Sequence, residues 1–147
     1  MLKVGSAAPD FSGTDQHGEQ ISLGSLLERG KLVLYFYPKD FTPVCTAQAC
    51  TFRDAASDLA DLGSNVVGVS GDSANSHERF GQKHKLPFSL LSDPDHRIIK
   101  AYDATWLFGR IRRVTYVIGA DRKVLGAFHH ELSAAKHLDD VKRLLRA

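Results

Sequence analysis

Residues 31–50 read KLVLYFYPKDFTPVCTAQAC, and they include both of the chain's two cysteines. After Lys31 the segment opens with a continuous apolar run rich in branched and aromatic side chains, which predicts a buried central strand that ends at Pro38. From Pro43 onward, apolar side chains recur three and four positions apart, which predicts an amphipathic helix over Pro43–Leu62. A strand that leads into a helix is the repeating unit of α/β proteins, so the cysteines are expected in the first turns of such a helix.

Strand and helix patterns alternate along the rest of the chain. The expected elements are an N-terminal hairpin over residues 10–23 that turns at His17-Gly18, strands at Val66–Val69 and Phe88–Leu91, helices at Ser73–Lys85 and His96–Tyr102, a hairpin of Val114–Ile118 with Val124–Phe128, and a last helix at Ser133–Leu145. This order predicts one α/β domain over residues 1–147, with helices on both faces of the sheet.

Composition argues against several classes of protein. The 147 residues are 43% hydrophobic and 24% charged, which is typical of a globular domain. The net charge is +2, and basic residues cluster only at Arg110, Arg112 and Arg113, so no nucleic-acid partner is expected. The N-terminal residues lack the apolar core of a signal peptide, and no apolar run could span a bilayer. We therefore expect no membrane partner and a cytoplasmic location, where two cysteines serve chemistry better than a permanent disulfide.

The start of the predicted helix suits an anionic sulfur. Thr42 lies where an N-cap is expected, and Pro43 takes the favoured first helical position. Cys45 then falls in the first turn, among backbone N–H groups that have no partner within the helix. These donors and the helix dipole favour a thiolate over a thiol. The sequence thus marks Cys45 as a candidate nucleophile. An isolated cysteine in this place is more often a small buried apolar residue below a threonine cap, and it is the surrounding pattern that favours the nucleophile.

Activation of the sulfur alone is too weak for a fast thiol enzyme. Lowering a cysteine pKa from ~8.5 to ~6 raises the thiolate fraction at pH 7 about thirtyfold, which is about 2 kcal/mol of barrier. Further groups must orient the substrate and stabilise the leaving charge. Thr42 offers the nearest hydroxyl, and an arginine from elsewhere in the fold is expected to complete the site.

A metal site and a general disulfide oxidoreductase are the alternatives. Cys45 and Cys50 lie about 140° apart around an ideal helix, so they cannot face one ion. Several histidines are expected at the surface: His77, His84, His129, His130 and His137. We therefore expect no metal. Disulfide oxidoreductases usually place two residues between their cysteines, and the four-residue gap here argues against that class.

Pro38, Thr42 and Cys45 match the proline–threonine–cysteine pattern of the peroxiredoxins. A second cysteine five positions on resembles the bacterioferritin comigratory protein branch, also called peroxiredoxin Q. Val44 stands where many members have glycine. The resemblance extends over nearly the whole chain, through the segments GSAAPDF (5–11), LVLYFYPKDFTP (32–43), GVSGDS (68–73), LLSDPDHRIIKAYDA (90–104) and RRVTYVIGADRKV (112–124).

The resemblance implies a thioredoxin-like fold, with a central mixed β-sheet flanked by helices and an N-terminal β-hairpin. It implies a thiol-dependent peroxidase that reduces hydrogen peroxide and organic hydroperoxides through a Cys45 sulfenic acid and an intramolecular Cys45–Cys50 disulfide. Thioredoxin or glutaredoxin is the expected reductant, no cofactor is expected, and the chain is expected to be a monomer, with a dimer as the alternative. A binding module on the same scaffold would have no reason to keep Thr42, Cys45 and Arg113 together.

The resemblance also assigns roles to residues around the nucleophile. Arg113, just before the strand that begins VTYVIG, matches the family's activating arginine, with Arg110 and Arg112 as local competitors. Pro38 matches a residue that shields the thiolate from water. Gln48 lies one turn further along the helix and is expected to support the hydrogen-bond network, although a surface position is equally ordinary for glutamine.

Overall fold

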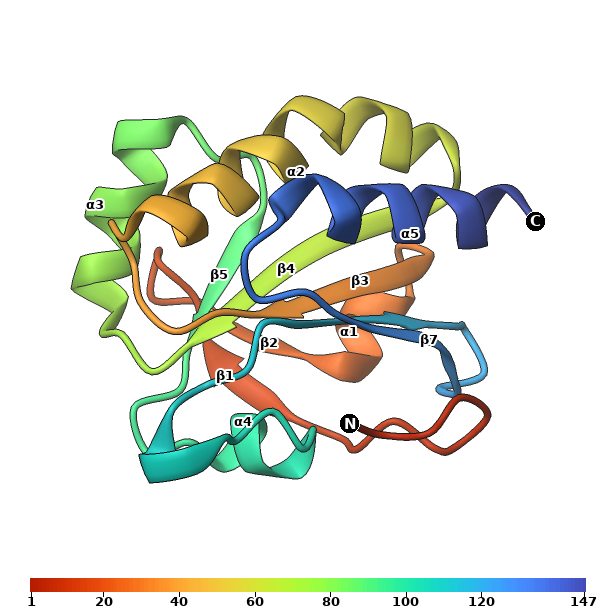
Figure 1. Cartoon of the computed structure of the whole chain (residues 1–147), viewed down its shortest axis with the longest axis horizontal. Coiled ribbons are helices and arrows are strands. Elements are labelled where there is room, and N and C mark those ends of the chain that lie inside the picture. Colours follow the sequence, from red (N-terminus) through yellow and green to blue (C-terminus); the bar gives the residue numbers. More distant parts are fainter.

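The computed structural model describes all residues 1–147 and contains one seven-stranded mixed sheet with helices on both faces (Figure 1). The strand order is β2-β1-β5-β4-β3-β6-β7. The strands are β1 Ser12–Thr14, β2 Gln20–Ser22, β3 Lys31–Phe36, β4 Ser64–Ser70, β5 Ser89–Ser92, β6 Val114–Ile118 and β7 Val124–His129. The helices are α1 Leu23–Leu27, α2 Pro43–Asp61, α3 Ala74–His84, α4 Arg97–Ala101 and α5 Ala134–Arg146, with a single 3-10 turn η1 at Leu107–Gly109.

The centre of the sheet is parallel and both of its sides are antiparallel. β3, β4 and β5 run in the same direction, whereas β6 pairs antiparallel with β3 and β1 pairs antiparallel with β5. Parallel strands bring their carboxyl ends to one edge, which is where α/β proteins build sites. The loop from β3 to α2 and the loop from β4 to α3 therefore emerge together, at the left of Figure 1.

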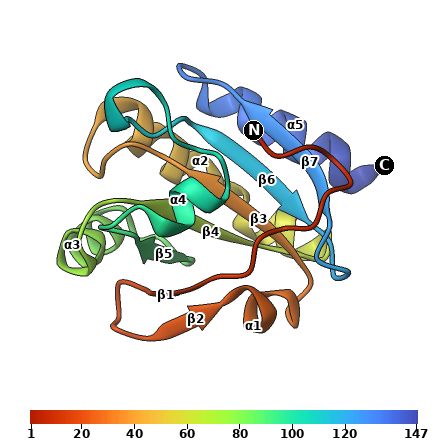
Figure 2. The same cartoon turned by 90° about the horizontal axis from the view of Figure 1, so that it is seen from below.

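Each face of the sheet has its own apolar core. One core lies beneath α2 and α5 and includes Cys45, Phe52 and Phe80. The other lies beneath α1 and α4 and includes Leu26 and Ile99. Figure 2 shows the second face, with α4 in front of the central strands and the N-terminal segment running towards β7. The sulfur of Cys45 is thus part of a packed core and does not lie in an exposed loop.

All the elements expected from the sequence are present, with shifts of one or two residues at their ends. β4 begins at Ser64, two residues earlier than predicted, because Gly63 turns the chain with a positive φ of 77° and Ser64 already pairs with Lys31. The sequence pattern predicts neither α1 nor η1.

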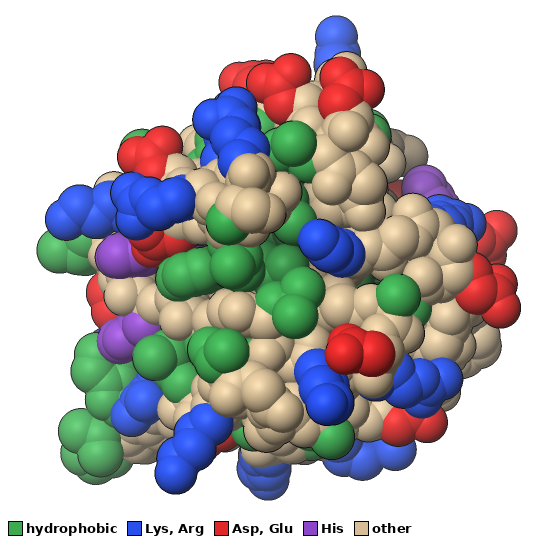
Figure 3. Space-filling view, turned by 90° about the vertical axis from the view of Figure 1, so that its right-hand side faces the viewer, with side chains coloured by type: hydrophobic (Ala, Val, Ile, Leu, Met, Phe, Trp, Pro, Cys, Tyr) green, Lys and Arg blue, Asp and Glu red, His purple; other side chains and the backbone are tan.

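The surface agrees with the small net charge. Figure 3 shows basic and acidic side chains interspersed on the visible face. None of the helices has the length and apolar content needed to cross a membrane.

Candidate active site

Cys45 lies in the first turn of α2, where the sequence predicts it. Thr42 is the N-cap residue and Pro43 follows it at the helix start. The Cys45 side chain is 1% exposed, and its Sγ accepts a hydrogen bond of 2.8 Å from Nη1 of Arg113. A guanidinium at this distance stabilises a thiolate and leaves other N–H groups free to bind a substrate oxygen.

Arg113 is the arginine that the fold brings to the sulfur. It directly precedes β6, which lies beside β3, and it is 8% exposed. Its backbone N–H donates to Oε2 of Glu131 at 2.9 Å, which fixes the start of the strand. Of the two competitors, Arg110 is exposed and Arg112 lies over the ring of Trp106.

Thr42 occupies the N-cap position but does not cap the helix with its side chain. Its hydroxyl instead donates to the carbonyl of Lys39 at 2.8 Å. The prediction that Thr42 is the N-cap residue is therefore confirmed, but its side chain does not make the capping hydrogen bond. The proton of the Thr42 hydroxyl is engaged in the bond to Lys39, so its oxygen keeps lone pairs that can accept a hydrogen bond from a bound substrate.

Pro38 follows β3 and is half-buried. It lines a shallow groove at the carboxyl edge of the sheet, together with Asp72, His96 and Arg110. Its expected role as a shield for the sulfur stays a prediction.

Gln48 lies on the buried side of α2, one turn beyond Cys45, and it is 0% exposed. The surface alternative for this residue is wrong. Neither its amide nitrogen nor its amide oxygen has a hydrogen-bond partner. A buried amide without partners is costly, which is typical of a residue kept for function.

Cys50 lies seven residues after Pro43 on the same unbroken helix and is half-buried. Both cysteines are free thiols. Five residues of ideal helix separate two Cα atoms by roughly 8–9 Å, whereas a disulfide needs less than about 7 Å. The folded helix therefore cannot hold a bond between the two sulfurs.

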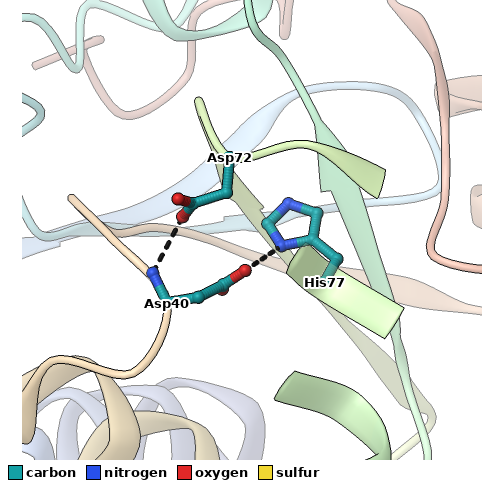
Figure 4. Close-up of side chains that lie close together, drawn as sticks. All are labelled: Asp40, Asp72 and His77. Carbon is teal, nitrogen blue, oxygen red and sulfur yellow. Dashed lines mark hydrogen bonds and ion pairs between the residues drawn. The ribbon is translucent and has the colours of Figure 1, made fainter. Parts of the chain in front are cut away.

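His77 is fully buried, so its expected place at the surface is wrong. Its Nδ1 lies 2.7 Å from Oδ2 of Asp40 (Figure 4). Its Nε2 lies 3.0 Å from the carbonyl of Leu91. Asp40 also accepts hydrogen bonds from the Tyr37 hydroxyl and from Ser76. The sequence gives no sign of this pair, because residues 40 and 77 meet only once β3 and β4 lie side by side.

Asp40, Asp72 and His77 place three possible metal ligands within 4.8 Å of one another. Oδ2 of Asp72 accepts from the backbone N–H of Asp40 at 2.8 Å and from the Ser70 hydroxyl at 2.7 Å. The ligand atoms are thus engaged in hydrogen bonds within the protein. These hydrogen bonds hold the loop before Cys45 against β4 and α3. The arrangement therefore fits a structural hydrogen-bond network better than a metal site.

His137 is also buried, at 1% exposed, which corrects the expected surface position. Its Nδ1 lies 2.9 Å from the Thr115 hydroxyl and its Nε2 lies 2.8 Å from the carbonyl of His130. Burial lowers the pKa of His137 from 6.5 to about 4. His137 is therefore neutral. It joins α5 to Thr115 on β6, and Thr115 lies two residues after Arg113. His129 and His130 are half-buried beside Glu131 and Asp140.

The low pKa of His137 predicts a loss of stability in acid. The unfolded chain takes up a proton near pH 6.5, whereas the folded chain resists it until about pH 4, so stability present above pH 6.5 is lost as the pH falls towards 4. We expect about 2 kcal/mol less unfolding free energy at pH 5 than at pH 7 from this residue. Urea unfolding of wild type and His137→Gln at both pH values measures it. An equal pH dependence in the two proteins would contradict the assignment.

The sequence and the structure are both similar to those of one protein family. The model of the AhpC/TSA family matches residues 4–126. Chloroplastic peroxiredoxin Q of Sedum lineare is 42% identical over 146 residues, which cover 97% of this chain and 77% of that protein. Chloroplastic peroxiredoxin Q of Arabidopsis thaliana is 42% identical, over 99% of this chain and 68% of its own length.

Two solved structures are similar over almost their full length. The crystal structure of peroxidoxin BcpB from Mycobacterium tuberculosis has a TM-score of 0.94 and 35% identity, and covers 99% of this chain and 97% of its own. Peroxiredoxin Q from Xanthomonas campestris has a TM-score of 0.87 and 31% identity, over 99% and 96% of the two chains.

Proposed function

This chain belongs to the AhpC/TSA family and is a peroxiredoxin of the peroxiredoxin Q type, and from that premise we propose that Cys45 reduces hydroperoxides and is then resolved by Cys50. Family membership implies a thiol peroxidase that consumes a peroxide and a thiol reductant. Beyond what family membership implies, we propose the reacting residues, the intramolecular disulfide and the reductant. The observation that carries it is the 2.8 Å contact between Arg113 and the buried sulfur of Cys45.

The first step uses the groups around Cys45. The thiolate forms a bond to the terminal oxygen of the peroxide and the O–O bond breaks. The leaving oxygen takes up from water the proton that the thiol released on ionising, and it departs as water or an alcohol. Arg113 donates hydrogen bonds to the sulfur and to the peroxide, so it holds the two in line and stabilises the developing charge. The Thr42 oxygen accepts a hydrogen bond from the peroxide, Pro38 limits water at the sulfur, and Gln48 is proposed to support the hydrogen-bond network from one turn further along α2. The product on Cys45 is a sulfenic acid.

The second step requires α2 to unwind locally. The residues between the two cysteines must leave helical geometry before the sulfurs can meet, and this should cost little, because they form the first two turns of the helix. Closure releases water and leaves a Cys45–Cys50 disulfide. An external dithiol, which we propose is thioredoxin or glutaredoxin, then reduces this bond.

Circular dichroism should detect the unwinding. The oxidised protein should have a smaller helical signal than the reduced protein, and a dithiol should restore it. In Cys50→Ser the first step proceeds but closure cannot, so sulfenic and then sulfinic acid should accumulate on Cys45. Mass spectrometry measures these products. An oxidised wild type that keeps all of its helix would contradict the unwinding.

A coupled assay tests the proposed function as a whole. Peroxide consumption is followed with hydrogen peroxide and with an organic hydroperoxide, in the presence of thioredoxin, of glutaredoxin or of dithiothreitol alone. We expect turnover of both peroxides and faster turnover with one of the two protein reductants. Turnover with dithiothreitol but with neither thioredoxin nor glutaredoxin would contradict the proposed reductants, and no peroxide loss with any reductant would contradict the peroxidase itself.

The protein is proposed to act as a monomer in the cytoplasm. The plant relatives are named as chloroplastic proteins, which does not support that location, so it stays a prediction. Cell fractionation and sedimentation at micromolar concentration measure the two properties.

A further inference from the structure

Cys50 has a histidine beside it. Its Sγ lies 3.8 Å from Nδ1 of His84, the last residue of α3, and both side chains are half-buried. The imidazole packs edge-on against the buried ring of Phe80, with centroids 5.0 Å apart, so its place is set by the core. We propose that His84 accepts the proton of Cys50 when Cys50 attacks the oxidised Cys45. The inference rests on the proposed function and adds a catalytic residue to its second step.

The contacts of α2 indicate which cysteine moves. Phe52 is fully buried and stacks on Tyr35 with ring centroids 4.9 Å apart. Nη1 of Arg53 donates to the carbonyl of His84 at 2.8 Å. The helix is therefore fixed to the sheet and to α3 directly after Cys50. Unwinding of the turns before this point carries Cys45 outward, while Cys50 stays beside His84.

The step balances without a further reactant. Nδ1 of His84 takes the proton of the Cys50 thiol as the Cys50 sulfur forms a bond to the Cys45 sulfur. The S–O bond of the sulfenic acid breaks, and its hydroxide leaves with the proton that His84 returns. One sulfenic acid and one thiol give one disulfide and one water.

The surroundings of His84 favour its neutral form, which is the form that can accept a proton. Burial first, and then the charges of Lys83 on α3 and Arg53 on α2, lower the pKa of His84, so the imidazole is neutral at pH 7. An ordinary cysteine, with a pKa of ~8.5, is mostly protonated at that pH and attacks slowly without a base.

Single-turnover kinetics of closure test this role. Reduced wild type, His84→Gln and His17→Gln receive one equivalent of hydrogen peroxide, are quenched by thiol alkylation, and are analysed by mass spectrometry between pH 7 and pH 9.5. His17 is exposed in the β1–β2 turn and serves as the matched control. Loss of His84 should slow closure at pH 7 at least about tenfold and prolong the lifetime of the sulfenic acid, while the sulfenic acid forms at the wild-type rate. The control should behave as wild type.

The pH profile separates a proton acceptor from a structural residue. Wild-type closure should be nearly flat over this range, whereas closure in His84→Gln should rise with pH and approach the wild-type rate near pH 9.5, where thiolate forms without a base. Equal rates at pH 7, or a deficit in His84→Gln that persists unchanged at pH 9.5, would overturn the role of His84. The absence of any Cys45–Cys50 bond in wild type would instead overturn the proposed function.

Discussion

Cys45→Ser should lose peroxidase activity to less than a hundredth of the wild-type rate while it keeps its fold. Serine is close in size to cysteine and lies in the first helical turn, so the packing around it should persist. Its hydroxyl is a far weaker nucleophile than a thiolate and forms no sulfenic acid. The measurement is peroxide consumption with dithiothreitol, accompanied by circular dichroism and thermal unfolding.

Cys50→Ser is the matched control for this variant. It removes a half-buried thiol from the same helix but leaves the Arg113–Cys45 contact in place. It should consume one equivalent of peroxide at the wild-type rate in a single turnover. A Cys45→Ser protein that retains a tenth of the wild-type turnover would contradict the assignment of the nucleophile.

Arg113→Lys should lose much of the rate although it keeps the positive charge. A guanidinium offers a planar fork of donors that can hold the sulfur and the peroxide together, and an ammonium does not. Removal of one preorganised donor set costs about 2–4 kcal/mol of barrier, which corresponds to a rate lower by roughly thirtyfold to a thousandfold. Stopped-flow measurement of the second-order rate constant with hydrogen peroxide tests it.

Arg110→Lys provides the comparison for the arginine. Arg110 is exposed and lines the same shallow groove as Pro38. Its replacement should change the rate constant less than twofold. A normal rate in Arg113→Lys together with a slow Arg110→Lys would move the role to Arg110.

The sequence predicts the parts of this site that depend on local pattern. The apolar run before Pro38 predicts the strand, and the helical period of apolar residues predicts α2. Burial sets both patterns, so the sequence also places Cys45 at the start of the helix. Arg113 lies far from Cys45 along the chain, and it is the family resemblance, and no local pattern, that points to it.

Residues whose surroundings come from several elements could not be predicted in the same way. His77 and His137 lie in polar helical segments that are typical of a surface, yet both are buried. Asp40 in the loop between β3 and α2 pairs with His77, and Thr115 on β6 pairs with His137. Gln48 could equally have been exposed, since its place depends on how α2 rotates against the sheet. The contact of His84 with Cys50 likewise requires α3 to lie beside α2.

Peptide mapping after one equivalent of hydrogen peroxide tests the central claim most directly. Reduced wild-type protein is treated, alkylated and digested without a reducing agent. The account predicts a chain two mass units lighter than the reduced form, with the peptides of Cys45 and Cys50 joined within one molecule. Consumption of the peroxide with Cys45 still alkylated as a free thiol, or with Cys45 joined to a second chain, would contradict it.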